Sequence, residues 1–540
     1  MNSSNMILNS ATRRFIVGAI LILLVATGLR AYHLGRRSLW LDEAIAANIS
    51  RGTLGQTLAI TRGLHTAPIV DPLILYVVEK VSVTPIAVRI PSVAASLLAV
   101  LLMLCLYAIP SIGPRAAALG AFMLAVSAMQ IRYAQEVREY SLGVAYAVLL
   151  IYLFLSYVEK KPNDRSVIPL SVVLFFAPLV QYGLVLFGAA IIGSLVLLEL
   201  VAGLSRRETV RLAATIASLF TGSLISLFLT LRYQYGEATT YLDSYYFSPE
   251  TNLLRFVIGN THHVVTLFLP GVAVGAIAVA TMVFAIVTSI RARTVPPVPL
   301  LAFVSCGIVL TCSLFHVYPY GGTRQCLFLA PILCLFASTS VVMCLDRLPV
   351  RTRSYVLAAV TIITALSGAL QIRSVQPYAE IEDIQPVLTF MRSHLQPTDN
   401  VYVYSGAVPA VDFYIRRRDP LFLYDDFHRE DPQEYAQDVR AGVDPSATRL
   451  WIIFSHIYGD EDRRILKDLS VDWKIQEEVS AKNSALYLAS RPSGPAYNTA
   501  TATSATGSTV AEQVNLHSSF WAWNVRNFRQ QAQSKLTVTN

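Results

Sequence analysis

The strongest constraint on this chain is a series of apolar stretches, each about as long as a bilayer is thick. A helix needs about 20 apolar residues to cross the hydrocarbon core, and the sequence contains eleven candidates. Only 14% of the 540 residues are charged and 54% are hydrophobic, whereas soluble domains carry about 25% charged residues. The composition therefore excludes a string of soluble domains. The predicted spans are residues 15–33, 88–108, 116–131, 141–157, 166–181, 183–203, 212–231, 263–290, 298–317, 326–345 and 353–371.

The basic residues predict the orientation of these spans. They lie in short clusters between apolar stretches, where the positive-inside rule is strongest. The net charge of +8 therefore indicates cytoplasmic loops and not a nucleic-acid partner. We expect the first span to be an anchor, because its apolar stretch is long and no convincing signal-peptide cleavage site follows it. We place Arg13-Arg14, which precede it, inside. The other clusters then also fall inside: Lys160-Lys161-Arg165, Arg206-Arg207-Arg211, Arg291-Arg293 and Arg347-Arg351-Arg353.

The chain divides into three predicted regions. Residues 1–371 form the membrane domain, and residues 372–490 form a small extracytoplasmic α/β domain, because short strands alternate there with helices. Residues 491–540 are rich in Ser, Thr and Ala, which is typical of disorder. We expect strands at 401–404, 421–424, 450–454 and 485–488, and helices at 380–395, 431–440 and 460–470.

The first predicted outer loop carries two adjacent carboxylates, Asp42 and Glu43, next to Trp40. A carboxylate beside the bilayer could act as a base toward a substrate presented from the lipid. The same residues also suit an interfacial tryptophan and the first turn of a helix that Ser38 caps. The sequence leaves both interpretations open.

Three further outer segments hold polar residues that could contact a substrate. In 65–76, His65 and Asp71 flank prolines, although His65 could simply be exposed and Asp71 could cap a helix. The 132–140 turn contains Glu136, Arg138 and Tyr140. A guanidinium suits phosphate because its planar fork matches the phosphate oxygens, although arginines near helix ends also snorkel to the interface.

The loop 318–325 repeats this pattern. Tyr320 precedes Gly321-Gly322, which would let the backbone approach a ligand closely, and Arg324 opens the next span. An ordinary turn with interfacial tyrosines would look the same. The pair His262-His263 is too isolated to predict a metal site, since two ligands do not build a tetrahedron.

These motifs, taken in order, resemble the bacterial family 39-type glycosyltransferases of the GT-C superfamily, whose relatives include the protein O-mannosyltransferases and the lipid A aminoarabinose transferase. The resemblance covers about residues 1–345 and is carried by S-L-W-L-D-E, D-P-L-I-L-Y, R-I-P-S, Q-E-V-R-E-Y and G-G-T-R-Q. Residues 372–490 are also similar to the C-terminal domain of bacterial members. The resemblance implies a polytopic α-helical membrane protein in the bacterial inner membrane, with an extracytoplasmic active site.

The resemblance also implies roles for single residues. Asp42, with Glu43 beside it, would occupy the catalytic carboxylate position, and Arg138 and Arg324 would bind the phosphate of a polyprenyl-phosphate-linked sugar donor. The acceptor would be a hydroxyl of a glycan, lipid or protein, and no metal or other cofactor is implied. We expect the remaining motif residues to contact substrate: Trp40, His65, Asp71, Glu136, Tyr140 and Tyr320.

Two other classes of protein remain as alternatives. A multi-span transporter or lipid flippase would place ionisable residues inside the spans and would often show inverted repeats, whereas the acidic residues here cluster in predicted outer loops. A non-catalytic scaffold could use the α/β domain to hold partners.

Overall fold

The computed structural model describes residues 10–63, 68–159, 167–203, 205–232, 240–415, 422–424, 437 and 439–491. The chain forms two compact units, each built from two segments. The first unit comprises residues 1–34 and 65–378, and the second comprises residues 35–64 and 379–540. The predicted tail, apart from Arg491, and His65 lie outside the described residues.

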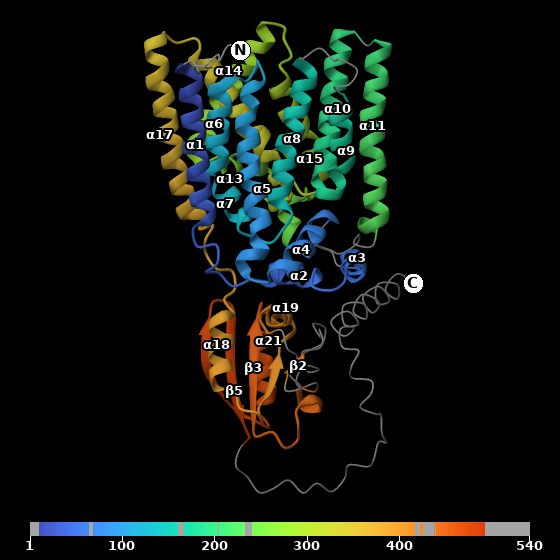
Figure 1. Ribbon diagram of the computed structural model, residues 1–540, viewed down its shortest axis with the longest axis vertical. Coiled ribbons are helices and arrows are strands. Elements are labelled where there is room, and N and C mark those ends of the chain that lie inside the picture. Colours follow the sequence, from blue (N-terminus) through green and yellow to red (C-terminus); the bar gives the residue numbers. More distant parts are fainter. Residues whose placement is uncertain are drawn as a thin grey trace, which may run out of the picture. The chain divides into compact units, whose positions relative to one another are not determined.

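The first unit is a bundle of apolar helices (Figure 1). Within the described residues, nine helices are long and apolar enough to cross a bilayer, and a bent pair of helices brings the total to ten. This is a polytopic membrane protein, as the apolar stretches predict. Its helices are α1 (Ser10–Ala31), α4 (Val70–Val81), α5 (Pro85–Cys105), α6 (Gly113–Val126), α7 (Ala128–Ala134), α8 (Tyr140–Glu159), α9 (Val167–Val180), α10 (Gly183–Ala202), α11 (Arg206–Ser226), α13 (Leu253–Phe268), α14 (Gly271–Arg291), α15 (Pro297–Leu314), α16 (Ala330–Leu345) and α17 (Val350–Val375).

The count differs from the eleven predicted spans because α9 is short. Its 14 residues rise about 21 Å at about 1.5 Å per residue, less than the roughly 30 Å of a hydrocarbon core. The predicted span 263–290 also begins later, because α13 ends at Phe268 and α14 starts at Gly271. Pro270 separates them and lacks the backbone N–H that would continue the helix.

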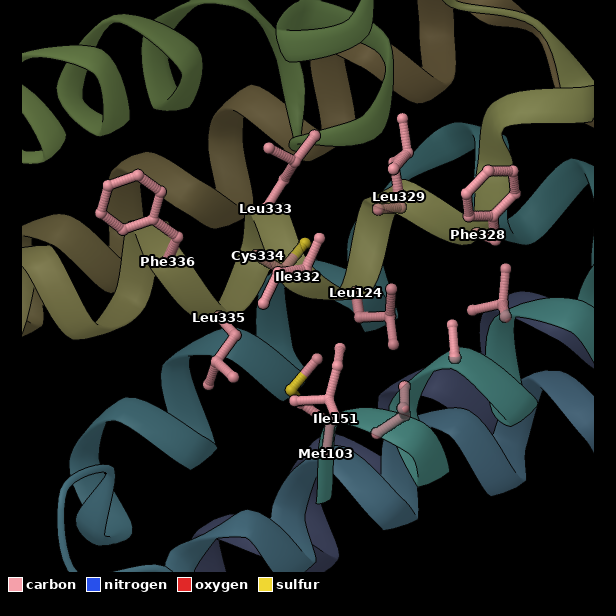
Figure 2. Packing of buried hydrophobic residues seen from close by; sticks show 14 of the residues in the cluster. Met103, Leu124, Ile151, Phe328, Leu329, Ile332, Leu333, Cys334, Leu335 and Phe336 are labelled. Carbon is pink, nitrogen blue, oxygen red and sulfur yellow. The ribbon is translucent and has the colours of Figure 1, made fainter. Parts of the chain in front are cut away.

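Helix α16 forms the centre of the bundle, since 83% of its span is buried. Figure 2 shows its residues Ile332 and Leu335 among Met103 of α5, Leu124 of α6 and Ile151 of α8. Such packing inside a membrane relies on close contact between helices, because lipid tails are as apolar as the side chains.

The second unit contains a five-stranded mixed sheet of order β2-β1-β3-β5-β4. Strand β1 runs parallel to β2 and β3, while β5 runs antiparallel to β3 and β4. Strand β4 was absent from the prediction, because its sequence KIQEEVSA is largely polar and it lies at the sheet edge. The strands are β1 (Asn400–Val403), β2 (Phe422–Tyr424), β3 (Arg449–Ser455), β4 (Lys474–Ala481) and β5 (Ser484–Ser490).

Helices α18 (Gln385–His394), α19 (Val408–Tyr414) and α21 (Glu461–Leu469) accompany the sheet (Figure 1). The expected helix at 460–470 is confirmed, and the helix expected at 380–395 starts later, with Pro386 in its first turn. The helix expected at 431–440 lies mostly outside the described residues. Helices α2 (Leu41–Ile49) and α3 (Leu54–Gly63), from the first loop of the chain, also belong to this unit.

Candidate functional site

A bend between α6 and α7 shapes one end of the bundle. The two helices meet at 63°, which leaves the last carbonyls of α6 without helical partners. The fully buried guanidinium of Arg30 donates to two of them, at Leu124 (3.3 Å) and Ala125 (3.0 Å). On the other side, the Gln371 amide oxygen accepts from the N–H of Ala128 at 2.9 Å. These two side chains stabilise the bend, and sequence reasoning missed both, although an arginine inside an apolar span is itself a signal.

The turn that follows α7 is tied back to the first helix. The side-chain amide of Gln135 donates to the carbonyls of Arg30 (2.8 Å) and Tyr32 (2.7 Å). Arg132 pairs with the buried carboxylate of Glu136 at 3.2 Å. Glu136 is thus held by an ion pair within its own turn.

Arg138 and Arg324 lie against the same ring. Each guanidinium carbon is 5.7 Å from the ring centroid of Tyr140, a distance at which cations are attracted to an aromatic face. Arg138 is buried and also lies 3.6 Å from the carboxylate of Glu139, while Arg324 is half-buried at the start of a 3-10 turn, Arg324–Leu329. Two cations from distant parts of the sequence therefore converge on one aromatic side chain.

Asp71 belongs to the same group. It is buried in the first turn of α4, whose N-cap is Ile69, so Asp71 does not cap this helix as the alternative interpretation supposed. Burial raises the pKa of the Asp71 carboxyl to about 7, Glu139 adds repulsion, and Arg138 partly offsets it. We call Asp71, Arg138, Glu139, Tyr140 and Arg324 the arginine–carboxylate cluster.

The loop before Arg324 packs against α13 and the segment before it. The Tyr320 hydroxyl lies 3.0 Å from the hydroxyl of Thr261, and its N–H donates to the carbonyl of Tyr245 at 2.9 Å. A Cβ at Gly321 would come within 2.4 Å of the Tyr245 ring, and one at Gly322 within 3.1 Å of the α13 backbone. These two glycines therefore let the loop pack closely against Tyr245 and the backbone of α13.

In the second unit, the helix α2 that carries Asp42 and Glu43 is capped from far away in the sequence. Its N-cap is Trp40, which makes no side-chain capping bond. Instead the buried Glu382 accepts from the N–H of Leu41 at 3.0 Å, and its other oxygen contacts Nδ1 of His456. A carboxylate at a helix N-terminus complements the helix dipole. No local pattern in the sequence points to this contact.

The alternative in which Ser38 caps this helix is wrong. The Ser38 hydroxyl donates to Asp383 at 2.5 Å and accepts from the N–H of Gln385 at 3.2 Å. Ser38 therefore joins the first loop to the segment around α18 and leaves the N-terminus of α2 to Glu382.

The C-terminal end of α2 is held by α19. Asn48 donates to the carbonyl of Pro409 at 2.8 Å, and the two terminal nitrogens of Arg51 donate to the carbonyls of Asp412 (2.5 Å) and Phe413 (2.8 Å). These carbonyls lie at the end of α19, where a cation is favourable. Helix α19 follows β1, and His456, which contacts Glu382, follows β3. Residues after the carboxyl ends of these parallel strands therefore hold helix α2. Open α/β sheets commonly bind ligands at these ends.

The two adjacent carboxylates of α2 differ in accessibility. Glu43 is 1% exposed, whereas Asp42 is half-buried, so Asp42 is the one that solvent or a substrate reaches. Trp40 is also half-buried. In the described part of the chain, no three His, Cys, Asp or Glu side chains gather into a group that could hold a metal ion.

The fold is similar to solved membrane glycosyltransferases. ArnT from Cupriavidus metallidurans matches with a TM-score of 0.55 in its apo state and 0.54 bound to undecaprenyl phosphate, at 14% identity, with 88–89% of this chain and 97–98% of that chain covered. The archaeal oligosaccharyltransferase AglB from Archaeoglobus fulgidus, in complex with an inhibitory peptide and a dolichol-phosphate, matches with a TM-score of 0.52 at 10% identity, covering 81% of this chain and 69% of that one.

Sequence comparisons add no closer relative. No family model matches the chain, and no curated protein matches it. The chain therefore has a GT-C-like fold, a multi-pass helical membrane unit with a small mixed-sheet domain after it.

Proposed function

We propose that this protein is a glycosyltransferase that moves a sugar from a polyprenyl phosphate to an acceptor hydroxyl. The observation that carries the proposal is the placement of Arg138 and Arg324 against the Tyr140 ring. Two guanidinium groups in a mostly buried cluster suit a lipid-linked phosphate, because both charge and fork geometry match its oxygens. The similarity to structures of ArnT with undecaprenyl phosphate and AglB with dolichol-phosphate supports the same class of donor.

The proposed location is the bacterial inner membrane, with the cluster and the mixed-sheet domain outside the cytoplasm. This orientation is supported by basic residues at the other end of the bundle. Arg291 ends α14, Arg347 follows α16, and Arg353 lies in the first turn of α17. Arg324 precedes α16, whereas Arg347 follows it, and Arg138 lies with Arg324 at the Tyr140 ring. Neither Arg138 nor Arg324 therefore belongs to the basic loops that are expected to face the cytoplasm.

The proposed reaction is a single displacement at the anomeric carbon. The acceptor oxygen forms the new glycosidic bond while the bond between the sugar and the phosphate breaks, and the electron pair leaves with the polyprenyl phosphate. Asp42 accepts the acceptor proton as general base. One displacement inverts the anomeric centre. Asp42 suits this role better than Glu43, because Glu43 is buried.

The leaving group gains negative charge as the bond breaks, and Arg138 and Arg324 would stabilise that charge. Preorganised cations act strongly where water is excluded. Arg138 is 7% exposed and fixed by Tyr140 and Glu139. In this role the arginines would lower the free energy of the transition state more than that of the bound donor.

Asp42→Asn in purified, reconstituted protein tests the base. Sugar transfer from a labelled polyprenyl-phosphate sugar should fall about 10²–10⁴-fold, while Asp243→Asn, at an exposed aspartate of another loop, should leave it unchanged. Undiminished transfer by a folded Asp42→Asn variant would remove Asp42 from this role. Movement of intact lipid across the bilayer without sugar transfer would instead indicate a flippase.

The arginines are tested by pairs of variants. Arg138→Lys and Arg324→Lys keep the positive charge but lose the planar guanidinium that can donate two hydrogen bonds to phosphate. They should therefore keep more transfer activity than the corresponding alanine variants. The folded state of each variant is checked by its thermal unfolding. Equal activity of wild type and both alanine variants would rule out a phosphate role.

A further inference from the structure

A large cleft lies at the end of the bundle opposite the arginine–carboxylate cluster. It is a cleft of about 1350 Å³ lined by α1, α6, α14, α16 and α17. The cleft reaches Asp346 just after α16, whereas Arg324 of the cluster lies before α16, so a whole membrane span separates the two. Its volume exceeds the roughly 300–1000 Å³ of sites for drug-sized ligands, which favours a long-chain ligand.

The walls of the cleft are apolar and loosely covered by protein. Only 11% of the span in α1 and 22% of that in α17 is buried. Leu21 and Val25 of α1 line the cleft and are 57% and 43% exposed. Gly18 also lines it, and a Cβ there would meet nothing within 4 Å. Apolar surface of this kind at membrane depth is covered by acyl chains.

One end of the cleft is basic and rich in hydroxyl groups. Its charged lining residues are Arg14, Arg115 and Asp346. Asp346 accepts from Arg115 at 3.3 Å and from Arg353 at 3.1 Å, so one carboxylate faces two guanidinium groups, and Arg14 adds a third cation to the cleft lining. In addition, Ser340 lines the cleft and is almost fully buried, and its hydroxyl has no hydrogen-bond partner among the described residues.

We propose that this cleft binds one anionic glycerophospholipid. The acyl chains lie along the walls formed by α1, α6 and α17, and the phosphate lies between Arg14 and Arg115. The excess of positive charge selects an anionic headgroup over a zwitterionic one. Basic pockets between membrane helices commonly recognise anionic headgroups in this way. The site is independent of the proposed transferase reaction, because it shares no residue with the arginine–carboxylate cluster.

Native mass spectrometry of the full chain in mild detergent tests the site, with dioleoyl phosphatidylglycerol and dioleoyl phosphatidylcholine as probes. Wild type should bind one phosphatidylglycerol molecule about tenfold more tightly than phosphatidylcholine. Gly18→Leu adds a bulky side chain to the wall of the cleft, where it competes with an acyl chain, and should reduce phosphatidylglycerol binding by about tenfold. Gly28→Leu is the matched control, because Gly28 is also on α1 with open space at its Cβ but does not line the cleft. It should bind as wild type does.

A double variant, Arg14→Gln with Arg115→Gln, tests the headgroup. It should lose the preference for phosphatidylglycerol while it still binds either lipid weakly. Equal binding of both lipids by wild type, or unchanged binding after Gly18→Leu, would overturn the proposal. Thermal unfolding without added lipid checks that each variant is folded, and Gly28→Leu controls for the effect of a larger side chain on α1.

Discussion

Asp71 makes the stability of the protein depend on pH in a direction that can be worked out. The pKa of its carboxyl is about 7, mainly because of burial, against an ordinary value of 3.8. The folded state therefore holds a proton that the unfolded state releases, so stability is greatest below pH 3.8 and is lost as pH rises through 7. The difference between a pKa of 3.8 and one of about 7 corresponds to about 4 kcal/mol of lost stability above pH 7. Asp71→Asn mimics the protonated form and should avoid that loss.

The assay compares thermal unfolding of wild type and Asp71→Asn in one detergent at pH 5 and pH 8. The stability advantage of the variant should be about 3 kcal/mol larger at pH 8, because between these values the unfolded carboxyl is already ionised while folded Asp71 keeps its proton up to about pH 7. Asp243→Asn, at an exposed aspartate, serves as the control and should show no such change. An advantage of equal size at both pH values would refute the reasoning. A variant less stable than wild type at both would indicate that Arg138 keeps Asp71 ionised.

Two further predictions concern how each unit holds its helices. Glu382→Gln removes a charged acceptor from the N–H of Leu41 and should lower the free energy of unfolding by about 1–3 kcal/mol. Hydrogen exchange of the α2 amides should then accelerate. Unchanged exchange would show that Glu382 does not hold this helix. Gly222→Ala would place a Cβ 1.9 Å from the Phe175 carbonyl oxygen and should destabilise the bundle by about 1–3 kcal/mol, as measured by thermal unfolding. Gly307→Ala, which faces open space, should be neutral, and equal effects of the two would contradict the close contact.

The sequence predicted the membrane helices well, because an apolar stretch of about 20 residues is a local property that needs no knowledge of neighbours. It overestimated α9, whose apolar stretch is longer than its helix. It missed β4, because an edge strand need not be apolar. It predicted the other four strands, but their parallel or antiparallel pairing came only from the structure.

Much less of the candidate site than of the membrane helices could be predicted from the sequence. The motifs identified Arg138, Arg324 and Asp71 as candidates, but the sequence also offered an ordinary explanation for each one. Only the packed bundle brings the two arginines to the same Tyr140 ring and buries Asp71 beside them.

Hydropathy and charge along the chain thus determined that this protein spans a membrane many times, and they predicted which way it faces. The tertiary structure decided that the first loop belongs with the distant mixed-sheet domain, where Glu382 caps the helix carrying Asp42. The physical reason is that transfer of a segment into lipid depends on that segment alone. A hydrogen bond or ion pair between distant segments depends on the packing of both, which no local pattern records.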